Sequence, residues 1–196
     1  IIDMHVEATR KALNVGFDAV QIHMGHGYLI DQFFDSRINT RDDKYGGSIE
    51  NRCRFGLELI HKLVEEFGAE KIMIRISPSR FMNKLYEWPD LDEMLFYFIN
   101  ELNKTNLRMI DISCANANYF DTSGKIVRKI RELGWNKTIV GGASLTLDEA
   151  NKEVSEGYLD LVTWGRSILA NPDFVKKIDN NKEILTMTDE IRKNLY

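Results

Sequence analysis

The sequence predicts an α/β fold in which parallel strands alternate with helices. Five short apolar runs are separated by segments whose apolar residues recur three and four positions apart, the spacing of amphipathic helices. Glycines stand where most of these helical segments stop, at Gly16, Gly68, Gly134 and Gly157. Strands that alternate with helices form parallel sheets through right-handed crossovers. No shift in composition marks a linker, so we expect residues 1–196 to form a single domain.

The first half of the chain is expected to supply two strands. Apolar positions from Ile2 to Leu13 predict an opening helix, and its start at the first residues suggests that the chain begins within a domain. Residues 17–22 follow as a strand. After a long polar segment, residues 35–48, an apolar stripe from Phe55 to Phe67 predicts a helix, and residues 71–76 form the next strand.

The second half is expected to supply three more strands, at residues 109–112, 138–140 and 159–164. Pro89-Asp90 opens a helix that reaches Leu102, and a weaker stripe predicts another helix through residues 126–133. Thr146 with Glu149 forms a capping box, and Asn171-Pro172 is expected to begin a closing helix. Residues 80–88 fit no pattern, although their aromatic side chains suit a substrate entrance or a cover for a barrel mouth.

Composition excludes several classes of protein. The 196 residues are 43% hydrophobic and 29% charged, with a formal net charge of −4, so no basic field favours nucleic acid. No apolar run approaches the roughly 18 residues of a membrane span, and no secretory segment is evident. Cys53 and Cys114 are too few and too far apart for a disulfide framework or a cysteine-rich metal site. We therefore expect a cytoplasmic protein with no metal.

Two architectures suit five alternating units, a doubly wound open sheet and part of a (β/α)8 barrel. No Gly-x-Gly-x-x-Gly follows the first strand, which disfavours a dinucleotide-binding open sheet. Gly141-Gly142 follows the fourth strand and Gly165-Arg166 the fifth, as in barrels that bind phosphate with the loops of their last two strands. A complete barrel needs eight strands and about 250 residues, so the sequence predicts a partial TIM-type barrel of about five β/α units.

The segment His23-x-x-His26-Gly27-Tyr28-Leu29-Ile30-Asp31-Gln32-Phe33 follows the first apolar run, where a barrel strand delivers polar groups to substrate. Together with Asn39-x-Arg41 and Asp43-Lys44-Tyr45-Gly46-Gly47-Ser48-x-x-Asn51-Arg52-x-Arg54-Phe55, it resembles the old yellow enzyme family of FMN-dependent NAD(P)H:flavin oxidoreductases. Arg75-Ile76-Ser77, Gly141-Gly142 and Gly165-Arg166-x-x-x-Ala170-Asn171-Pro172-Asp173 follow in the family's order. The resemblance covers nearly the whole chain and implies that the first three barrel strands are absent. We expect either a missing amino-terminal portion or self-association to complete the barrel.

The resemblance implies a catalytic set of His23, His26 and Tyr28. Two imidazole N–H groups that converge on a carbonyl or nitro oxygen would stabilise the charge that develops during hydride transfer. Tyr28 resembles the family's proton donor, a role that a phenol fills only when it is well placed. A packed histidine pair, a metal site and a half-buried tyrosine are the plainer alternatives.

The resemblance also implies a cofactor-binding set. Arg75, a charge within an apolar strand, would face the flavin ring, and the alternative is an ion pair with a carboxylate inside the barrel. Gly141, Gly142 and Ala143 would bring backbone N–H groups to the FMN phosphate, and Gly165 and Arg166 would add further donors. The segment from Asp43 to Arg54 is interpreted as structural, a turn and helix cap that tie down the long loop.

The expected activity is a ping-pong cycle in which NADH or NADPH reduces FMN, and the reduced flavin passes hydride to an activated alkene, a quinone or a nitro compound. The alternatives are a flavin-free phosphate-binding barrel enzyme and a non-catalytic half-barrel. The first would need a Schiff-base lysine or a carboxylate pair at strand ends, and no strand carries such a lysine. Retention of flavin by the purified protein distinguishes the expected activity from both.

Overall fold

The computed structural model describes residues 1–115 and 117–194. The chain divides into two compact units, Ile1–Val162 and Thr163–Tyr196. Whether the two units form a single domain stays a prediction. No helix in the described part of the chain is both long enough and apolar enough to cross a membrane.

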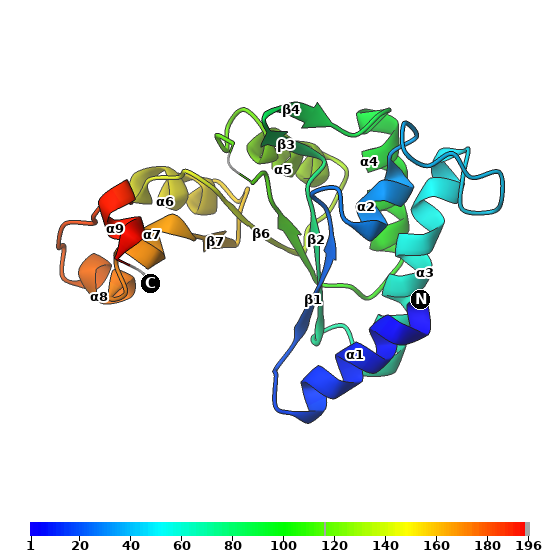
Figure 1. Cartoon of the computed structure of the whole chain (residues 1–196), viewed down its shortest axis with the longest axis horizontal. Coiled ribbons are helices and arrows are strands. Elements are labelled where there is room, and N and C mark those ends of the chain that lie inside the picture. The colour runs from blue at the N-terminus through cyan, green and yellow to red at the C-terminus, as the bar shows by residue number, and fades with distance from the viewer. Residues whose placement is uncertain (116, 195–196) are drawn as a thin grey trace. The chain divides into compact units, whose positions relative to one another are not determined.

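The elements of the first unit are shown in Figure 1. Its helices are α1 (Ile2–Asn14), α2 (Leu29–Phe34), α3 (Ile49–Phe67), α4 (Leu91–Asn103), α5 (Ser123–Glu132) and α6 (Leu147–Ser155). Its strands are β1 (Val20–Met24), β2 (Ile72–Ile76), β3 (Ser79–Met82), β4 (Lys84–Glu87), β5 (Met109–Ile112) and β6 (Thr138–Gly142), and β7 (Leu161–Thr163) ends across the unit boundary.

The main sheet has the strand order β1-β2-β5-β6-β7, and β3 and β4 form a separate antiparallel hairpin. The pairs β1–β2, β2–β5 and β5–β6 are all parallel. Because each strand lies beside the next main-sheet strand along the chain, the order never reverses, as it would in a doubly wound sheet. This sequential order is the one a (β/α) barrel requires.

The core of the first unit lies between the sheet and the helices that cover one side of it. Figure 1 shows α1, α3 and α4 on the same side of β1 and β2. Ile72, Ile74 and Ile76 point to this side and are fully or almost fully buried, whereas Met73 and Arg75 alternate with them and are only half-buried. The period of two therefore separates an apolar face, which packs on helices, from a more polar interior face.

Strand β1 is displaced along the sequence from the predicted one. It begins at Val20 and continues through His23 to Met24, whereas the prediction was residues 17–22. Phe17 belongs to the exit of α1, because its N–H donates to the Ala12 carbonyl at 3.2 Å. The polar His23 remains in the strand because it alternates with Ile22 and Met24, which are buried.

Several short elements went unpredicted, among them α2 and the two strands of the hairpin, β3 and β4. Helix α2 has six residues, too few for a periodic pattern to stand out. The hairpin of β3 and β4 occupies residues that fitted no pattern. The capping box at Thr146 and Glu149 is confirmed, as are β5 at its predicted bounds and the closure of α3 by Gly68.

The second unit holds α7 (Arg166–Ala170), α8 (Phe174–Asp179) and α9 (Asp189–Lys193). The prediction that Asn171 caps the closing helix is wrong, because α8 begins at Phe174 after Asp173. Asn171 is buried and its side-chain amide donates to the carbonyls of Ser167 and Leu185 at 2.8 and 2.9 Å. These bonds hold the turn between α7 and α8 to the segment that follows α8.

Candidate functional site

A row of polar side chains crosses three neighbouring strands near their carboxyl ends. His23 on β1 is paired in register with Arg75 on β2, and Arg75 is paired with Asp111 on β5. Paired residues of parallel strands project to the same face, so all three belong to the interior face of the sheet. The carboxyl ends of barrel strands are where substrates are bound in this architecture.

Asp111 is the acceptor at the centre of this row. Its Oδ2 accepts from Arg75 Nε at 2.6 Å and from Gln21 Nε2 at 2.9 Å, and the residue is 2% exposed. The ion pair with an interior carboxylate, the plainer alternative for Arg75, is therefore present. The Arg75 side chain is nevertheless 34% exposed, so the ion pair does not bury it fully. Neither Gln21 nor Asp111 was predicted as a site residue, although both are polar residues inside apolar strands.

The structure brings His23, His26 and Tyr28 together. The ring centroid of His23 lies 5.2 Å from that of His26 and 5.0 Å from that of Tyr28. His23 lies on β1 itself, beyond the predicted end of that strand at residue 22. His26 lies in the turn beyond the strand, and Tyr28 is exposed at the start of α2.

Each histidine has a buried ring nitrogen without a partner in the described part of the chain. These atoms are His23 Nδ1 and His26 Nε2. A buried polar atom that makes no hydrogen bond costs free energy, and such atoms in a folded protein call for an explanation such as a ligand. The two nitrogens lie on neighbouring rings, whose centroids are 5.2 Å apart.

Both histidines are held neutral. Burial, together with the smaller effects of His23, Arg80 and Arg75, lowers the pKa of His26 to about 4. The pKa of His23 is also lowered, first by burial and then by the charge of Arg75. At neutral pH each ring therefore carries one N–H and one unprotonated nitrogen.

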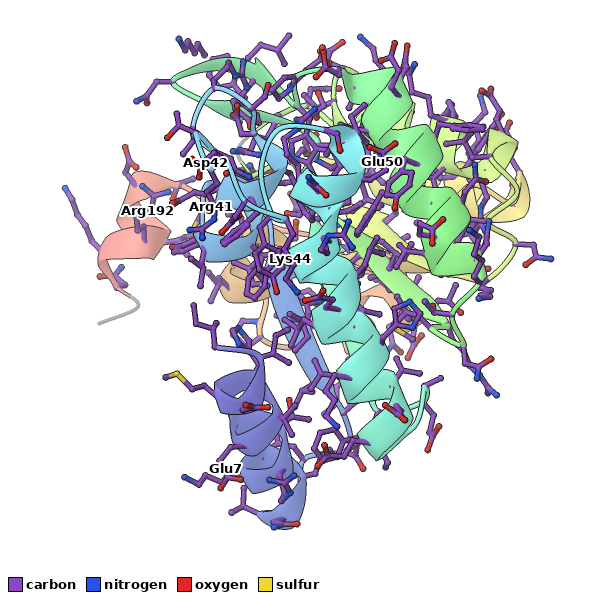
Figure 2. The ribbon with its side chains drawn as sticks, turned by 90° about the vertical axis from the view of Figure 1, so that its right-hand side faces the viewer. Glu7, Arg41, Asp42, Lys44, Glu50 and Arg192 are labelled. Atoms are coloured by element: carbon purple, nitrogen blue, oxygen red, sulfur yellow. The ribbon has the colours of Figure 1, made fainter. Side chains whose placement is uncertain are left out.

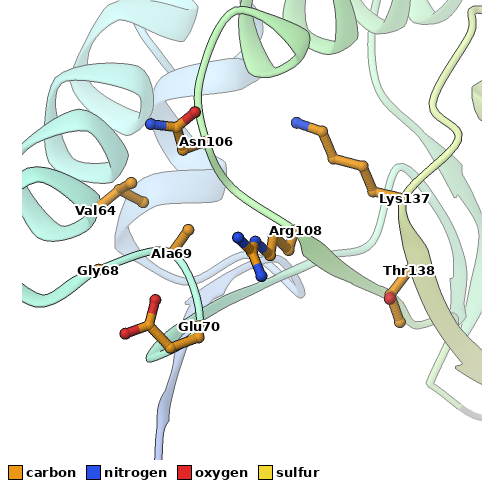
Figure 3. A pocket seen from close by; sticks show the side chains of 8 residues that line it. All are labelled: Val64, Gly68, Ala69, Glu70, Asn106, Arg108, Lys137 and Thr138. Atoms are coloured by element: carbon orange, nitrogen blue, oxygen red, sulfur yellow. The ribbon is translucent and has the colours of Figure 1, made fainter.

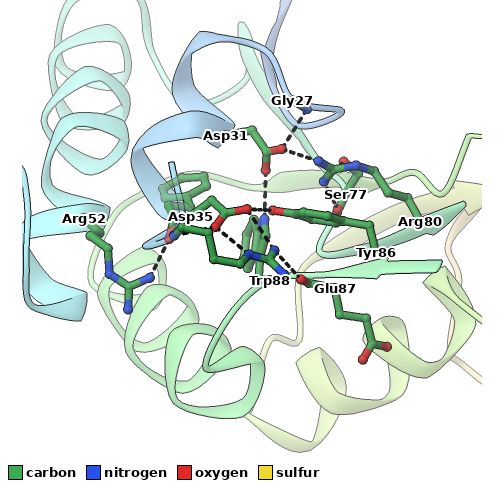
Figure 4. A network of polar contacts seen from close by, with 11 residues as sticks. Gly27, Asp31, Asp35, Arg52, Ser77, Arg80, Tyr86, Glu87 and Trp88 are labelled. Carbon is green, nitrogen blue, oxygen red and sulfur yellow. Dashed lines mark hydrogen bonds and ion pairs between the residues drawn. The ribbon is translucent and has the colours of Figure 1, made fainter. Parts of the chain in front are cut away.

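The turn that carries His26 is bonded to residues that the sequence did not reveal. The His26 N–H donates to Ser77 Oγ at 2.7 Å, and the Gly27 N–H donates to Asp31 Oδ2 at 2.8 Å. Arg80, in β3, contacts both acceptors (Figure 4). Ser77 lies in the Arg75-Ile76-Ser77 motif and Asp31 in the histidine motif, so the motifs contained the two acceptors without indicating their partner.

The helix cap predicted within the segment from Asp43 to Arg54 is confirmed. Ser48 caps α3 by accepting from the Asn51 N–H at 3.3 Å, and the Asn51 side chain donates to the Gly46 carbonyl at 3.0 Å. Arg52, 2% exposed, donates to the Phe34 carbonyl at 2.6 Å. Figure 2 shows Arg41, Asp42 and Lys44 on this loop and Glu50 on the first turn of α3. The segment ties the loop to α2 and α3.

The residues predicted to hold phosphate lie in both units. Gly141 and Gly142 end β6 and are buried, and a Cβ at Gly141 would meet Leu159 Cδ2 at 2.8 Å. Ala143 follows with φ 81°. Gly165 precedes α7 in the second unit, and Arg166 begins that helix with an exposed side chain. The phosphate role of each set stays a prediction.

A hollow of about 700 Å³ opens at the opposite end of the strands, beside the amino-terminal ends of β2, β5 and β6 (Figure 3). Its lining includes Glu70, Arg108 and Lys137, and Lys137 Nζ donates to the carbonyls of Thr105 and Leu107 at 3.1 and 2.9 Å. None of the predicted site residues lines it. Among the described residues no group of three or more histidine, cysteine or acidic side chains is placed to hold a metal.

Residues 1–184 match the model of the NADH:flavin oxidoreductase / NADH oxidase family. The chain belongs to this family. A relative named putative 12-oxophytodienoate reductase 11, from Oryza sativa subsp. japonica, is 37% identical over 187 residues, which are 91% of this chain and 49% of the relative. A relative named probable flavin mononucleotide-dependent alkene reductase, from Leishmania infantum, is 35% identical over 176 residues, 90% of this chain and 47% of that protein.

Solved structures of the family have the same fold. Morphinone reductase superposes with a TM-score of 0.83 at 26% identity, covering 97% of this chain and 51% of its own. The old yellow enzyme homologue from Zymomonas mobilis gives a TM-score of 0.85 at 26% identity, covering 97% and 54%. The chain thus spans about half the length of these family members. The predicted resemblance and the partial (β/α)8 barrel are both confirmed.

Proposed function

We propose that the chain carries the acceptor-binding part of an FMN-dependent oxidoreductase that uses NADH or NADPH to reduce activated alkenes, quinones or nitro compounds. The observation that supports it most is the pair of buried, unpartnered nitrogens on His23 and His26, beside Arg75 at the carboxyl ends of β1 and β2. The name of the Leishmania relative agrees with alkene reduction. The activity concerns the complete barrel, of which this chain spans part.

The residues present fit FMN. Arg75 is held by Asp111, yet one-third of its side chain is exposed, which suits a cation that faces an electron-rich ring. Gly141 and Gly142 have no side chain to keep a phosphate from the backbone. When bound, FMN supplies the hydride.

His23 and His26 hold the oxygen of the acceptor. Each neutral imidazole donates one N–H to a carbonyl or nitro oxygen, and negative charge grows on that oxygen as the neighbouring atom is reduced. Because the rings are already placed by β1 and its turn, little reorganisation accompanies the reaction. Removal of one such preorganised donor from an enzyme typically costs about 3–4 kcal/mol of transition-state stabilisation.

Tyr28 supplies the proton to the acceptor carbon that receives no hydride. Its ring lies 5.0 Å from that of His23, and its side chain is exposed, so the hydroxyl can exchange protons with water between turnovers. A phenol that is well placed beside the substrate serves as a general acid.

Further strands are expected to pair with β1. In the described sheet β1 pairs on one side only, with β2. An unpaired strand edge presents free N–H and C=O groups to another strand. A further part of the same protein or a second copy would extend the sheet there and complete the barrel.

The test measures the reduction of cyclohex-2-enone by the FMN-saturated chain with NADPH. The reaction is monitored as the decrease in enone absorbance. The His23→Ala and His26→Ala variants are compared with His61→Ala, a substitution on the exposed side of α3. We expect the first two to lose activity and the third to retain it. A chain that binds FMN and reduces the enone equally well in all three variants would refute the role of the histidine pair.

A further inference from the structure

The turn after β1 is in a conformation that needs support. His26 has φ 57° and Gly27 has φ 80°, so two successive residues lie in the left-handed region. A non-glycine residue there is strained and persists only where its surroundings fix it. The orientation of the His26 imidazole therefore depends on the groups that bond this turn.

Two side chains accept hydrogen bonds from the backbone N–H groups of the turn, and one arginine contacts both of these side chains (Figure 4). Ser77 Oγ accepts from His26 N at 2.7 Å, and Asp31 Oδ2 accepts from Gly27 N at 2.8 Å. Arg80 Nη1 donates to the Ser77 carbonyl at 2.9 Å and to Ser77 Oγ at 3.2 Å, while Arg80 Nη2 lies 2.8 Å from Asp31 Oδ2. Arg80 thus contacts both acceptors that hold the turn.

The hairpin of β3 and β4 holds Arg80 in place. Arg80 is paired with Tyr86 across the hairpin, and its guanidinium carbon lies 3.7 Å from the Tyr86 ring centroid. The Tyr86 hydroxyl donates to Asp35 Oδ2 at 2.6 Å. Trp88, at the end of the hairpin, donates from Nε1 to Asp31 Oδ1 at 2.8 Å. The hairpin therefore holds both members of the Arg80–Asp31 ion pair, Arg80 through Tyr86 and Asp31 through Trp88.

The ion pair itself is buried. Arg80 is 4% exposed and Asp31 1% exposed, so neither charge is compensated by solvent. Loss of one partner of a buried pair leaves the other charge uncompensated, and the surrounding bonds rearrange. The acceptors of the His26 and Gly27 N–H groups, Ser77 and Asp31, are among the groups whose bonds would rearrange.

We propose that Arg80, acting with Asp31, is a positioning residue for His26: it holds the two acceptors that keep the turn of His26 and Gly27 in its left-handed conformation. The inference rests on the proposed function for its catalytic meaning, because His26 is the proposed acceptor-binding residue. The effect of Arg80 on the turn is independent of FMN, of substrate and of turnover. The hairpin that the sequence did not predict is, on this account, the support of the histidine turn.

The test uses the full chain without flavin and measures amide hydrogen exchange at His26 and Gly27 and the ¹H–¹⁵N correlation of the His26 imidazole. Arg80→Gln is expected to accelerate exchange at both amides at least tenfold relative to the core strands and to shift or split the imidazole signals. Arg80→Lys retains the charge and is expected to restore part of the protection.

Arg128→Gln is the matched control. Arg128 also pairs with a buried acid, Glu153, at 2.7 Å, and lies 3.9 Å from the centroid of a tyrosine ring, Tyr158. The Arg128→Gln variant is expected to have a lower global stability, while amide exchange at His26 and Gly27 stays unchanged relative to the core. A purely structural role for Arg80 predicts that the two variants behave alike at the turn, and that result would overturn the proposal.

Ser77→Ala covers the case in which Arg80→Gln does not fold. It removes only the hydroxyl that accepts from His26 N and is expected to accelerate exchange at His26 more than at the β2 amides. Unchanged His26 exchange in Ser77→Ala would count against the proposal in the same way. Failure of the chain to bind FMN would affect the proposed function but none of these measurements.

Discussion

Arg75 and Asp111 occupy paired positions on adjacent parallel strands, and their side chains meet at 2.6 Å. Asp111 is buried, whereas one-third of the Arg75 side chain reaches solvent. The carboxylate therefore fixes the position of a cation that is only partly buried. This pair connects the β5 strand to the site formed by β1 and β2.

Replacement of Asp111 by Asn should reduce stability. Arg75 would retain its charge without its carboxylate, and Gln21 would lose a charged acceptor. We expect the free energy of unfolding to fall by about 1–3 kcal/mol, as for other lost hydrogen bonds to charged groups. Urea denaturation measures it, with Asp92→Asn as the control, since that exposed carboxylate is expected to matter by less than about 0.5 kcal/mol. Equal losses in both variants would contradict the account.

Replacement of the histidines should separate donor chemistry from packing. In the FMN-saturated chain, His26→Ala is expected to lower kcat/KM for cyclohex-2-enone about 10²–10³-fold, the usual effect of losing one preorganised donor. His26→Asn keeps an N–H donor of similar reach and is expected to lose less. Steady-state kinetics measures both. Equal losses for Ala and Asn would show that the donor is not what matters.

Acid should destabilise the chain through His26. Its pKa in the folded chain is about 4, below the ordinary value of about 6.5, so the unfolded chain binds a proton first as the pH falls. The contribution of His26 to stability is therefore complete above about pH 6.5 and is lost toward pH 4, with a slope of at most about 1.4 kcal/mol per pH unit.

The measurement is the unfolding free energy across this window for the natural chain and for His26→Asn. The difference between the two slopes isolates His26 from the carboxylates that also titrate. We expect the variant to have the shallower slope. Parallel curves would mean that His26 titrates normally in the folded chain.

Replacement of Gly25 by Ala should disturb the junction of β1 and β2. A Cβ at this position would lie 2.6 Å from Ser77 Oγ and 2.9 Å from Ser77 N, so backbone as well as side chain must move. We expect a loss of about 1–3 kcal/mol, typical of overpacking, together with altered NMR signals for His26. Chemical denaturation and a ¹H–¹⁵N spectrum test this. A stable variant with an unchanged His26 signal would contradict it.

Periodicity predicted the alternation of strands and helices because those elements bury one regular face. It placed β1 three residues too early, because an apolar Phe17 at a helix exit resembles the first residue of a strand. Helix α2 and the β3–β4 hairpin escaped prediction because they are short and held by side-chain contacts between distant residues. Such contacts leave no local pattern in the sequence.

The candidate site was predicted unevenly for a similar reason. His23, His26 and Arg75 carry polar groups at the ends of apolar runs, so their positions could be inferred from sequence. The partners that fix them could not be inferred, because they are distant in the sequence. Asp111 is 36 residues from Arg75, and Arg80 is 49 residues from Asp31. The parallel register and the hairpin bring those residues together.

Uptake of FMN by the purified chain decides whether it carries part of a flavin site. The chain is prepared folded, as judged by a cooperative unfolding transition, and titrated into FMN while flavin fluorescence is followed, with Arg75→Met and Arg128→Met variants alongside. We expect saturable binding that Arg75→Met weakens and Arg128→Met leaves unchanged. A folded chain that neither retains flavin nor binds added FMN would contradict the proposed function.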